Sequence, residues 1–280
     1  MYRKITSLVV LILLSTALSA QDDATTLLKK LTGVEAISEG KTIPDRYSQD
    51  NRLEAASYLL FESSRFNADS RIVRYSATGM NVILEIPATN DSDEWVVLGA
   101  HYDSVKDCPG ANDNATGVAL VYEVAQHIAS LRQRNKNVYI VFFDEEEKGL
   151  IGSRNFARSL KDNNVNVHSA HTIDQMGWDQ DGDRGFELEM PDDELLYLYE
   201  DVAELNNFFV PIHTTNVTST DHKAFRELGY KAIGLTEEYK NNDTTPHYHK
   251  STDTFDTINL EYLKSTTNYM KKVFEALLTQ

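Results

Sequence analysis

Histidine and carboxylate side chains follow the ends of several apolar runs in this chain, and such side chains are the usual nitrogen and oxygen ligands of zinc. The apolar run from Trp95 to Leu98 leads to His101 and Asp103, and Asp113 follows ten residues after Asp103. Because binding sites of α/β proteins gather at the carboxyl ends of the strands, we expect these three side chains to meet at one edge of a sheet. The chemistry that they suit is the binding of a metal ion.

Four further candidates come later in the chain: Glu146, Glu147, Asp174 and His249. Taken singly, each is more often a solvated or capping residue, so it is their joint occurrence that favours a site. Asp103 stands two residues after His101, and residues two apart on a strand face the same way. Asp103 can therefore accept a hydrogen bond from the second ring nitrogen of His101 and orient the ring toward a metal.

Five motifs, taken in order, resemble those of peptidase family M28, the zinc peptidases that use two co-catalytic metal ions. The stretches that carry the resemblance are Gly99–Ser104, Gly110–Gly117, Glu146–Ser153, Asp174–Gly177 and Pro246–His249. The resemblance extends from about Arg52 to the C-terminus.

The resemblance implies that two zinc ions bind and that Asp113 bridges them. One zinc would also bind His101 and Asp174, and the other would bind Glu147 and His249. Three ligand carboxylates and one hydroxide would then balance the four positive charges of the two ions.

The two catalytic residues implied beside these ligands are Glu146 and Asp103. Glu146 would be the general base, and Asp103 would hold the ring of His101. The implied substrates are peptides with a free N-terminus, from which the N-terminal residue is hydrolysed. We expect an apolar or broad side-chain preference, with a substrate pocket drawn from Gln175, His222, Phe225, Tyr239 and Tyr248. Asp221 either supports this pocket or caps a helix.

Two other functions remain open. A glutaminyl cyclase uses one zinc on a similar fold for intramolecular acyl transfer, and a binding domain of the same fold would have no catalysis. A serine hydrolase is not supported, because the sequence has no Gly-x-Ser-x-Gly motif. A separate calcium ion could bind at Asp179, Asp181 and Asp183, although the default for such a run is a solvated turn.

The elements that must position these residues alternate between strands and helices. Helices are expected at 22–39, 52–66, 117–131, after Gly149, and at 192–207, 221–228 and 260–278. Strands are expected at 72–75, 81–86, 95–100, 137–144, 171–176, 187–190 and 232–236, with the first three as neighbours. This order predicts an α/β fold of three layers with a mostly parallel central sheet flanked by helices. The resemblance to family M28 implies that this fold is of the zinc aminopeptidase (phosphorylase/hydrolase-like) type.

The first twenty residues have the pattern of a secretory signal peptide. Arg3 and Lys4 precede an apolar core from Leu8 to Leu14, and small residues end at Ala20. We therefore expect residues 1–20 to be removed, residues 21–280 to form one catalytic domain, and the protein to be secreted or periplasmic. The single cysteine, Cys108, allows no disulfide within the chain.

The net charge of the chain is -16, and it becomes -18 once Arg3 and Lys4 are removed. A surface of this charge repels nucleic acids and anionic membranes, so neither is an expected partner. We expect peptide substrates, no stable membrane association after cleavage, and a monomer.

Overall fold

The computed structural model describes residues 24–66, 68–241 and 243–279, and its centre is a sheet of eight strands. The signal peptide predicted for residues 1–20 lies outside the described residues. The strands are β1 (Asp69–Arg74), β2 (Met80–Ile86), β3 (Glu94–His101), β4 (Asn137–Phe143), β5 (Asn166–Asp174), β6 (Phe186–Glu189), β7 (Ile212–Thr215) and β8 (Ala232–Thr236).

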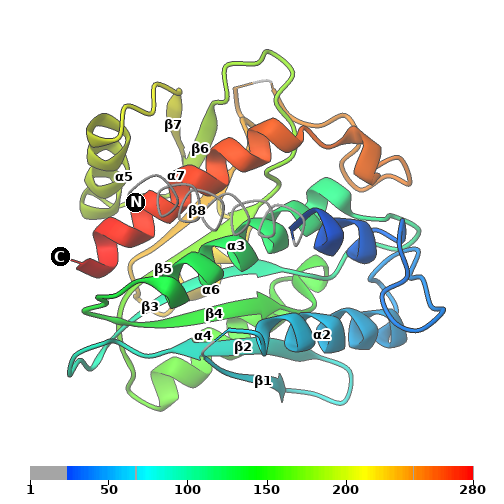
Figure 1. Cartoon of the computed structure of the whole chain (residues 1–280), viewed down its shortest axis with the longest axis horizontal. Coiled ribbons are helices and arrows are strands. Elements are labelled where there is room, and N and C mark those ends of the chain that lie inside the picture. The colour runs from blue at the N-terminus through cyan, green and yellow to red at the C-terminus, as the bar shows by residue number, and fades with distance from the viewer. Residues whose placement is uncertain (1–23, 67, 242, 280) are drawn as a thin grey trace, which may run out of the picture.

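The strand order is β1-β2-β4-β3-β5-β8-β6-β7, and the four central strands β4, β3, β5 and β8 run parallel to one another. On one side, β2 pairs antiparallel with β4, and β1 pairs antiparallel with β2. On the other side, β6 is antiparallel to β8 and parallel to β7. The predicted α/β fold with a mostly parallel central sheet is confirmed (Figure 1).

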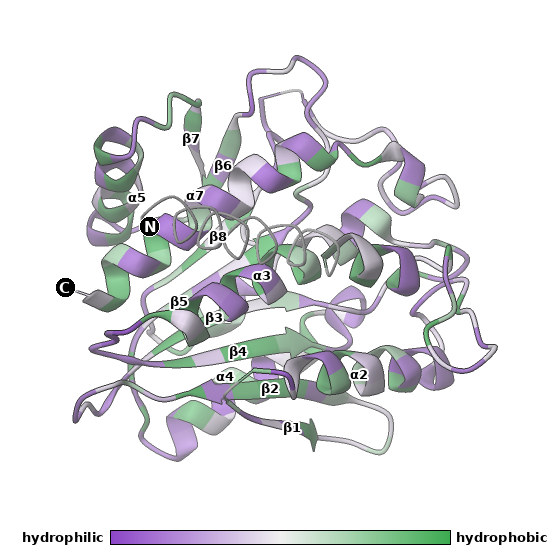
Figure 2. Cartoon of the chain, viewed as in Figure 1, coloured by the Kyte–Doolittle hydropathy of each residue, from purple (hydrophilic) through white to green (hydrophobic). Residues whose placement is uncertain are grey.

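Helices cover both faces of the sheet. The helices α2 (Gln49–Ser63), α3 (Gly117–Ser130), α5 (Asp193–Leu205) and α7 (Leu260–Thr279) share one apolar core with the sheet. The second core contains residues of α4 (Ile151–Asp162) and α6 (His222–Arg226). Figure 2 shows the central strands as largely hydrophobic, as expected for strands buried on both faces.

Alternation along the strands assigns side chains to these two cores. On β3, Val96 and Leu98 belong to the larger core, whereas Val97 belongs to the core beneath α4 and α6. On β4, Ile140 and Val141 divide in the same way. Each such fully buried aliphatic side chain stabilises the fold by about 1.5–3 kcal/mol relative to exposure.

Two local expectations were wrong, and one strand was missed. The helix expected at 22–39 covers only 24–31 among the described residues, because the chain turns at Gly33, where φ is +75°. The strand expected at 95–100 is not a neighbour of 81–86, since β4 lies between them. β7 was not expected, because it is a short edge strand whose side chains are half-buried or exposed and carry little apolar signal.

Within the described residues, no helix has both the length and the apolar character that a membrane span requires.

Candidate metal centre

The candidate residues lie where the parallel strands end. His101 is the last residue of β3 and Asp174 is the last of β5, while Glu146 and Glu147 begin the short turn after β4. Because these three strands are parallel neighbours, their carboxyl ends meet at one edge of the sheet.

Two loops complete the cluster. Asp113 lies in the irregular turn Ala111–Thr116 that precedes α3, and His249 lies in the loop between β8 and α7. Asp113 is 3% exposed, so its carboxylate faces the interior.

The first group of ligand atoms surrounds Nε2 of His101. This nitrogen lies 3.3 Å from Oδ1 of Asp113 and 3.5 Å from Oδ1 of Asp174. The second group surrounds Nε2 of His249, which lies 3.2 Å from Oδ2 of Asp113 and 3.0 Å from Oε2 of Glu147. Asp113 therefore gives one oxygen to each group.

Several buried atoms of the cluster lack hydrogen-bond partners among the described residues. They are both ring nitrogens of His101, Oδ1 of Asp174 and Oε1 of Glu147. Leaving such atoms unpaired costs free energy unless something else binds them. Imidazole nitrogens and carboxylate oxygens are ligands that suit zinc, so the residues fit two zinc ions.

The electrostatics of the cluster also favour a cation. Burial, reinforced by the charge of Asp113, raises the pKa of Glu147 to about 7, and burial raises the pKa of Asp174 to about 6. Burial opposes ionisation of Asp113 too, but the imidazole rings of His101 and His249 beside it hold its pKa below the usual range. Closely packed carboxylates of this kind are stabilised by a bound divalent ion.

Glu146 lies beside the first group without belonging to it. Its Oε2 is 3.9 Å from Nε2 of His101. Burial raises the pKa of Glu146 well above its usual value; the charge of His101 opposes this shift, and the carboxylates of Asp221 and Asp174 add to it. A carboxylate in such surroundings has the affinity for protons that a general base needs.

Asp103 holds two parts of the site together. Its Oδ1 accepts the backbone N–H of Glu146 at 3.0 Å, and its Oδ2 accepts that of Glu147 at 3.2 Å. Oδ1 also lies 3.4 Å from Nδ1 of His101. The sequence predicted the contact with His101, but nothing in the spacing indicated the two backbone hydrogen bonds.

The loop that carries Asp113 is held from both ends of the chain. The carboxylate of Asp253 accepts the backbone N–H groups of Asn112 and Asp113, at 2.8 and 3.1 Å. The buried guanidinium of Arg46 donates to carbonyl oxygens of Leu31, Tyr102, Pro109 and Gly110.

Two asparagines connect this loop to the end of β5. The side chain of Asn114 donates to the carbonyl of Ile173 at 2.8 Å and accepts the N–H of Gln175 at 3.2 Å. Asn112 accepts the N–H of Gly177 at 2.7 Å. These bonds set the separation of Asp113 and Asp174.

Left-handed backbone occurs at two positions of the site. Gln175 has φ of +51° and His249 has φ of +57°, which costs a non-glycine residue free energy. His249 therefore combines an unfavourable backbone conformation with a side chain that is a candidate ligand of the second group.

A pocket with about 520 Å³ of empty space opens onto the cluster. Its walls include three residues expected there, Gln175, Tyr239 and Tyr248. His222 and Phe225 do not line it: His222 is fully buried beside Glu189, and Phe225 packs in the core beneath α4. His222 therefore contacts the pocket wall only through Thr220 and Glu189, and Phe225 belongs to the core behind it.

Asp221 begins α6 without capping it, since its side chain makes no capping hydrogen bond. Burial raises the pKa of Asp221 to about 7, and its Oδ1 has no hydrogen-bond partner among the described residues.

The aspartates considered for calcium have partners of their own. Oδ1 of Asp179 accepts the N–H groups of Gly182 and Arg184, and Oδ1 of Asp183 accepts that of Gly185. The three carboxylates approach one another, but these are the hydrogen bonds of a turn and do not support calcium.

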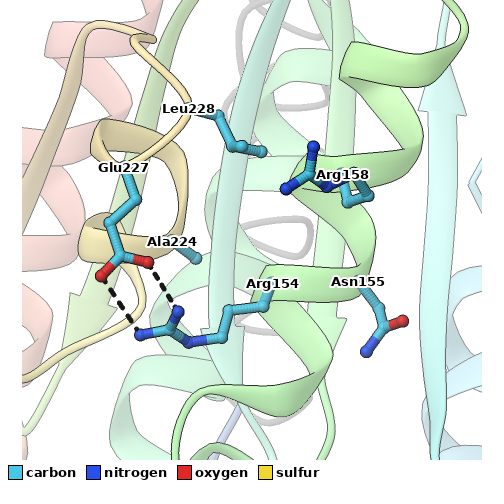
Figure 3. Close-up of a pocket in the computed structure, with 6 residues that line it drawn as sticks. All are labelled: Arg154, Asn155, Arg158, Ala224, Glu227 and Leu228. Carbon is cyan, nitrogen blue, oxygen red and sulfur yellow. Dashed lines mark hydrogen bonds and ion pairs between the residues drawn. The ribbon is translucent and has the colours of Figure 1, made fainter.

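A second pocket lies between α4 and α6, and none of the candidate metal ligands lines it. Figure 3 shows Arg154 of α4 paired with Glu227, with Arg158 and Leu228 nearby. Arg154 and Glu227 pair with each other at the surface, and the pocket suggests no chemistry.

Sequence reasoning missed Arg46, Asn112, Asn114 and Asp253. The asparagines flank Asp113 and could have been noticed as side chains that bind backbone groups in turns. Arg46 and Asp253 gave no signal, because their contacts come from distant parts of the chain.

Comparison with known proteins gives a consistent result. Residues 81–274 match the family described as peptidase family M28. Aminopeptidase YwaD of Bacillus subtilis is 27% identical over 210 residues, which cover 71% of this chain and 45% of that protein. The chain spans less than half the length of the curated relatives it matches.

Two solved structures illustrate the shared fold. The LapA aminopeptidase of Legionella pneumophila aligns with a TM-score of 0.78 at 20% identity, over 93% of this chain and 72% of LapA. A glutaminyl cyclase of Porphyromonas gingivalis aligns with a TM-score of 0.72 at 15% identity, over 92% of this chain and 98% of the cyclase. At such identities the likeness concerns the fold alone.

Proposed function

Because the chain belongs to peptidase family M28, we propose that it is an aminopeptidase that binds two zinc ions and removes N-terminal residues from peptides. The observation that carries the proposal is the position of Asp113. Its Oδ1 faces His101 at 3.3 Å and its Oδ2 faces His249 at 3.2 Å. A carboxylate between two separate groups of ligand atoms suits a bridge between two metal ions.

The ligands follow from the two groups of atoms. His101 and Asp174 would hold one ion, Glu147 and His249 the other, and Asp113 both. When bound, the zinc ions would lower the pKa of a water molecule and polarise the carbonyl group of the scissile peptide bond.

Glu146 carries the proton in this reaction. Its carboxylate takes a proton from the attacking water as the water oxygen bonds to the carbonyl carbon. It then gives the proton to the leaving nitrogen as the C–N bond breaks. Asp103 keeps Glu146 in place by accepting its backbone N–H.

Carboxylates also line the part of the pocket that is formed by the candidate metal ligands, and they favour exopeptidase action. Asp113, Glu146, Glu147 and Asp174 all line the pocket. The two ions would balance three of these carboxylates, which leaves the negative charge of Glu146 to attract a cationic α-amine, whereas an acetylated N-terminus is neutral.

Metal analysis and a substrate pair test the proposal. The purified protein, loaded with zinc and dialysed, should contain about two zinc ions per chain, and a chelator should abolish its activity. It should hydrolyse an unblocked peptide but not the same peptide with an acetylated N-terminus. Efficient cleavage of the acetylated peptide would overturn exopeptidase action.

Glutaminyl cyclisation is the second candidate, because this chain and the cyclase of Porphyromonas gingivalis cover almost all of each other. A peptide with N-terminal glutamine distinguishes the two reactions by its product. Release of the free residue supports hydrolysis, and loss of ammonia with about one zinc per chain supports the cyclase.

Export is a further part of the proposal and rests on the signal-like pattern of residues 1–20. Expression of the full chain in a bacterium with a secretory pathway should give a mature protein that begins at Gln21. N-terminal sequencing of the cell-associated and exported fractions checks this.

A further inference from the structure

Glu189 is a buried carboxylate that lines the same pocket and has no place in the proposed reaction. Its residue is 2% exposed. Its Oε2 accepts the hydroxyl of Thr220 at 2.6 Å and lies 3.3 Å from Nδ1 of His222. Its Oε1 accepts no hydrogen bond from any residue that the structure describes, and no described lysine or arginine pairs with it.

The sheet is shaped to bring this carboxylate into the pocket. Glu189 of β6 pairs in register with Gly234 of β8, and on the far side of β8 Gly234 pairs with Thr172 of β5. A Cβ atom at Gly234 would lie 2.4 Å from Oε2 of Glu189, so a side chain there would displace the carboxylate from its present position. The glycine therefore leaves room for the carboxylate of Glu189 over β8, the strand that lies between β6 and β5.

The remaining walls of the pocket are mostly polar. Among the described residues that line it, Val217 is the only aliphatic one. The other walls away from the metal ligands are Gln175, Ser219, Thr220, Thr236, Tyr239 and Tyr248. Burying a large aliphatic side chain against such walls would gain less free energy than in an apolar pocket.

One buried carboxylate elsewhere in this protein, Asp144, is paired with an arginine. Asp144 at the end of β4 is fully buried, and Nε of Arg52 lies 2.7 Å from its Oδ1. Glu189 has no lysine or arginine partner among the described residues and only the imidazole of His222 at 3.3 Å, so a cation brought by a ligand would further stabilise its charge.

We infer that Glu189 selects substrates whose N-terminal residue is lysine or arginine, by pairing its free Oε1 with the cationic side chain. The inference rests on the proposed aminopeptidase function and replaces the expectation of an apolar or broad preference. The rings of Tyr239 and Tyr248, each about half exposed, would contact the alkyl stem of the substrate side chain near the mouth.

Matched substrates test the inference on the wild-type enzyme. Lysyl and norleucyl substrates have similar shape and differ in charge, and so do arginyl and citrullyl substrates. We expect kcat/KM to be at least about tenfold higher for the charged member of each pair, as for a charge-assisted hydrogen bond. Equal or lower values for the charged members would overturn the inference. Hydrolysis of none of the four would instead count against the proposed function.

The variant Glu189→Gln assigns the preference to this residue, since glutamine can keep the bond from Thr220 while losing the charge. The lysyl-to-norleucyl ratio of kcat/KM should fall at least about tenfold, with norleucyl hydrolysis little changed. The control is Glu187→Gln on the same strand, where Oε1 accepts the backbone N–H groups of Lys240 and Asn241. It should keep the wild-type ratio.

Equal losses on both substrates in Glu189→Gln would show a structural role and overturn the assignment. So would an unchanged ratio. If Glu189→Gln does not fold, the wild-type comparison still decides whether a cationic side chain is preferred, and Glu189→Asp, which keeps the charge, should retain that preference.

Discussion

Glu146 and Glu147 are adjacent in the chain, yet their carboxylates face different surroundings. Glu147 lies 3.0 Å from His249 and belongs to a group of ligand atoms, whereas Glu146 is 3.9 Å from the nearest histidine nitrogen. The short turn after β4 separates them, and Asp103 accepts both of their backbone N–H groups. Two neighbouring acids can thus have distinct roles because one turn directs them apart.

Glu146→Gln should lose activity without losing metal. The amide keeps the size of the side chain but cannot take a proton, so kcat should fall by at least about a hundredfold. Zinc content measured by atomic emission should stay at the wild-type value. Glu204→Gln, an exposed position on α5, is the control for the loss of one charge. Near-normal turnover in Glu146→Gln would remove it as the general base.

Asp103→Asn should weaken the site by misplacing its parts. An amide cannot accept from both backbone N–H groups of the turn, because its nitrogen is a donor. We expect a loss of about ten- to a hundredfold in zinc affinity or kcat. Competition with a chelator measures the affinity, and Asp107→Asn, whose side chain is 80% exposed, is the matched control. Wild-type values in both assays would contradict the role of Asp103.

Among the elements, the loop before α3 depends on contacts that are remote in sequence. Arg46 reaches it from near the start of the chain, and Asp253 reaches it from the loop before α7. Burial lowers the pKa of Arg46, and the charge of Asp253 opposes that shift. The loop is therefore stable only while both long-range partners are in place.

Arg46→Met should destabilise the protein by about 3–5 kcal/mol, because it leaves four carbonyl oxygens without their donor and removes the positive charge that interacts with Asp253. Urea unfolding followed by circular dichroism measures the change. An m-value equal to that of the wild type would indicate that both proteins unfold in the same two-state manner. Arg71→Met, on the exposed edge strand β1, should cost less than about 1 kcal/mol. Equal losses in both variants would refute this account of Arg46.

The central elements could be predicted from sequence because their signals are local. The strand expected at 232–236 has the observed bounds of β8, and the helix expected at 260–278 differs from α7 by one residue. The start of α2 was placed three residues late, although Ser48 caps it by accepting the N–H of Asn51. Strand order was harder, since β4 comes between β2 and β3 through pairings that no local pattern reveals.

The site was predictable only in part, for the same reason. The types and order of His101, Asp113 and Asp174 indicated that they would meet, and the structure brings their ligand atoms within 4.8 Å of one another. Glu189 gave no signal, because its place in the pocket depends on the absence of a side chain at Gly234 on another strand.

For the whole molecule, stability should depend on pH through a histidine far from solvent. His171 of β5 is fully buried, and its ring nitrogens lie 3.0 Å from the hydroxyls of Ser169 and Tyr199. Burial lowers the pKa of His171 to about 3, and the charge of His168 adds to this. Between pH 3 and pH 6.5 the unfolded chain therefore binds the proton more tightly than the folded protein does, so stability falls as pH falls.

The free energy of unfolding should drop by about 1.4 kcal/mol between pH 7.5 and pH 5.5 through this residue alone. His171→Gln removes the titrating group. The unfolding free energy of the wild type minus that of the variant should therefore fall by about 1.4 kcal/mol when the pH is lowered from 7.5 to 5.5. Urea unfolding at the two pH values measures it. A difference that does not change with pH would show that His171 does not contribute.

The loop of Asp113 is anchored by residues that are distant in sequence, so its contacts become available at different times during synthesis of the chain. A growing chain contains His101, Asp113 and Asp174 well before it contains His249 and Asp253. The ligands of one proposed metal position are thus all present in a nascent chain while the other proposed position still lacks its histidine and the loop still lacks its last anchor. The two positions are completed one after the other, and the C-terminal quarter of the protein decides when the second can be filled.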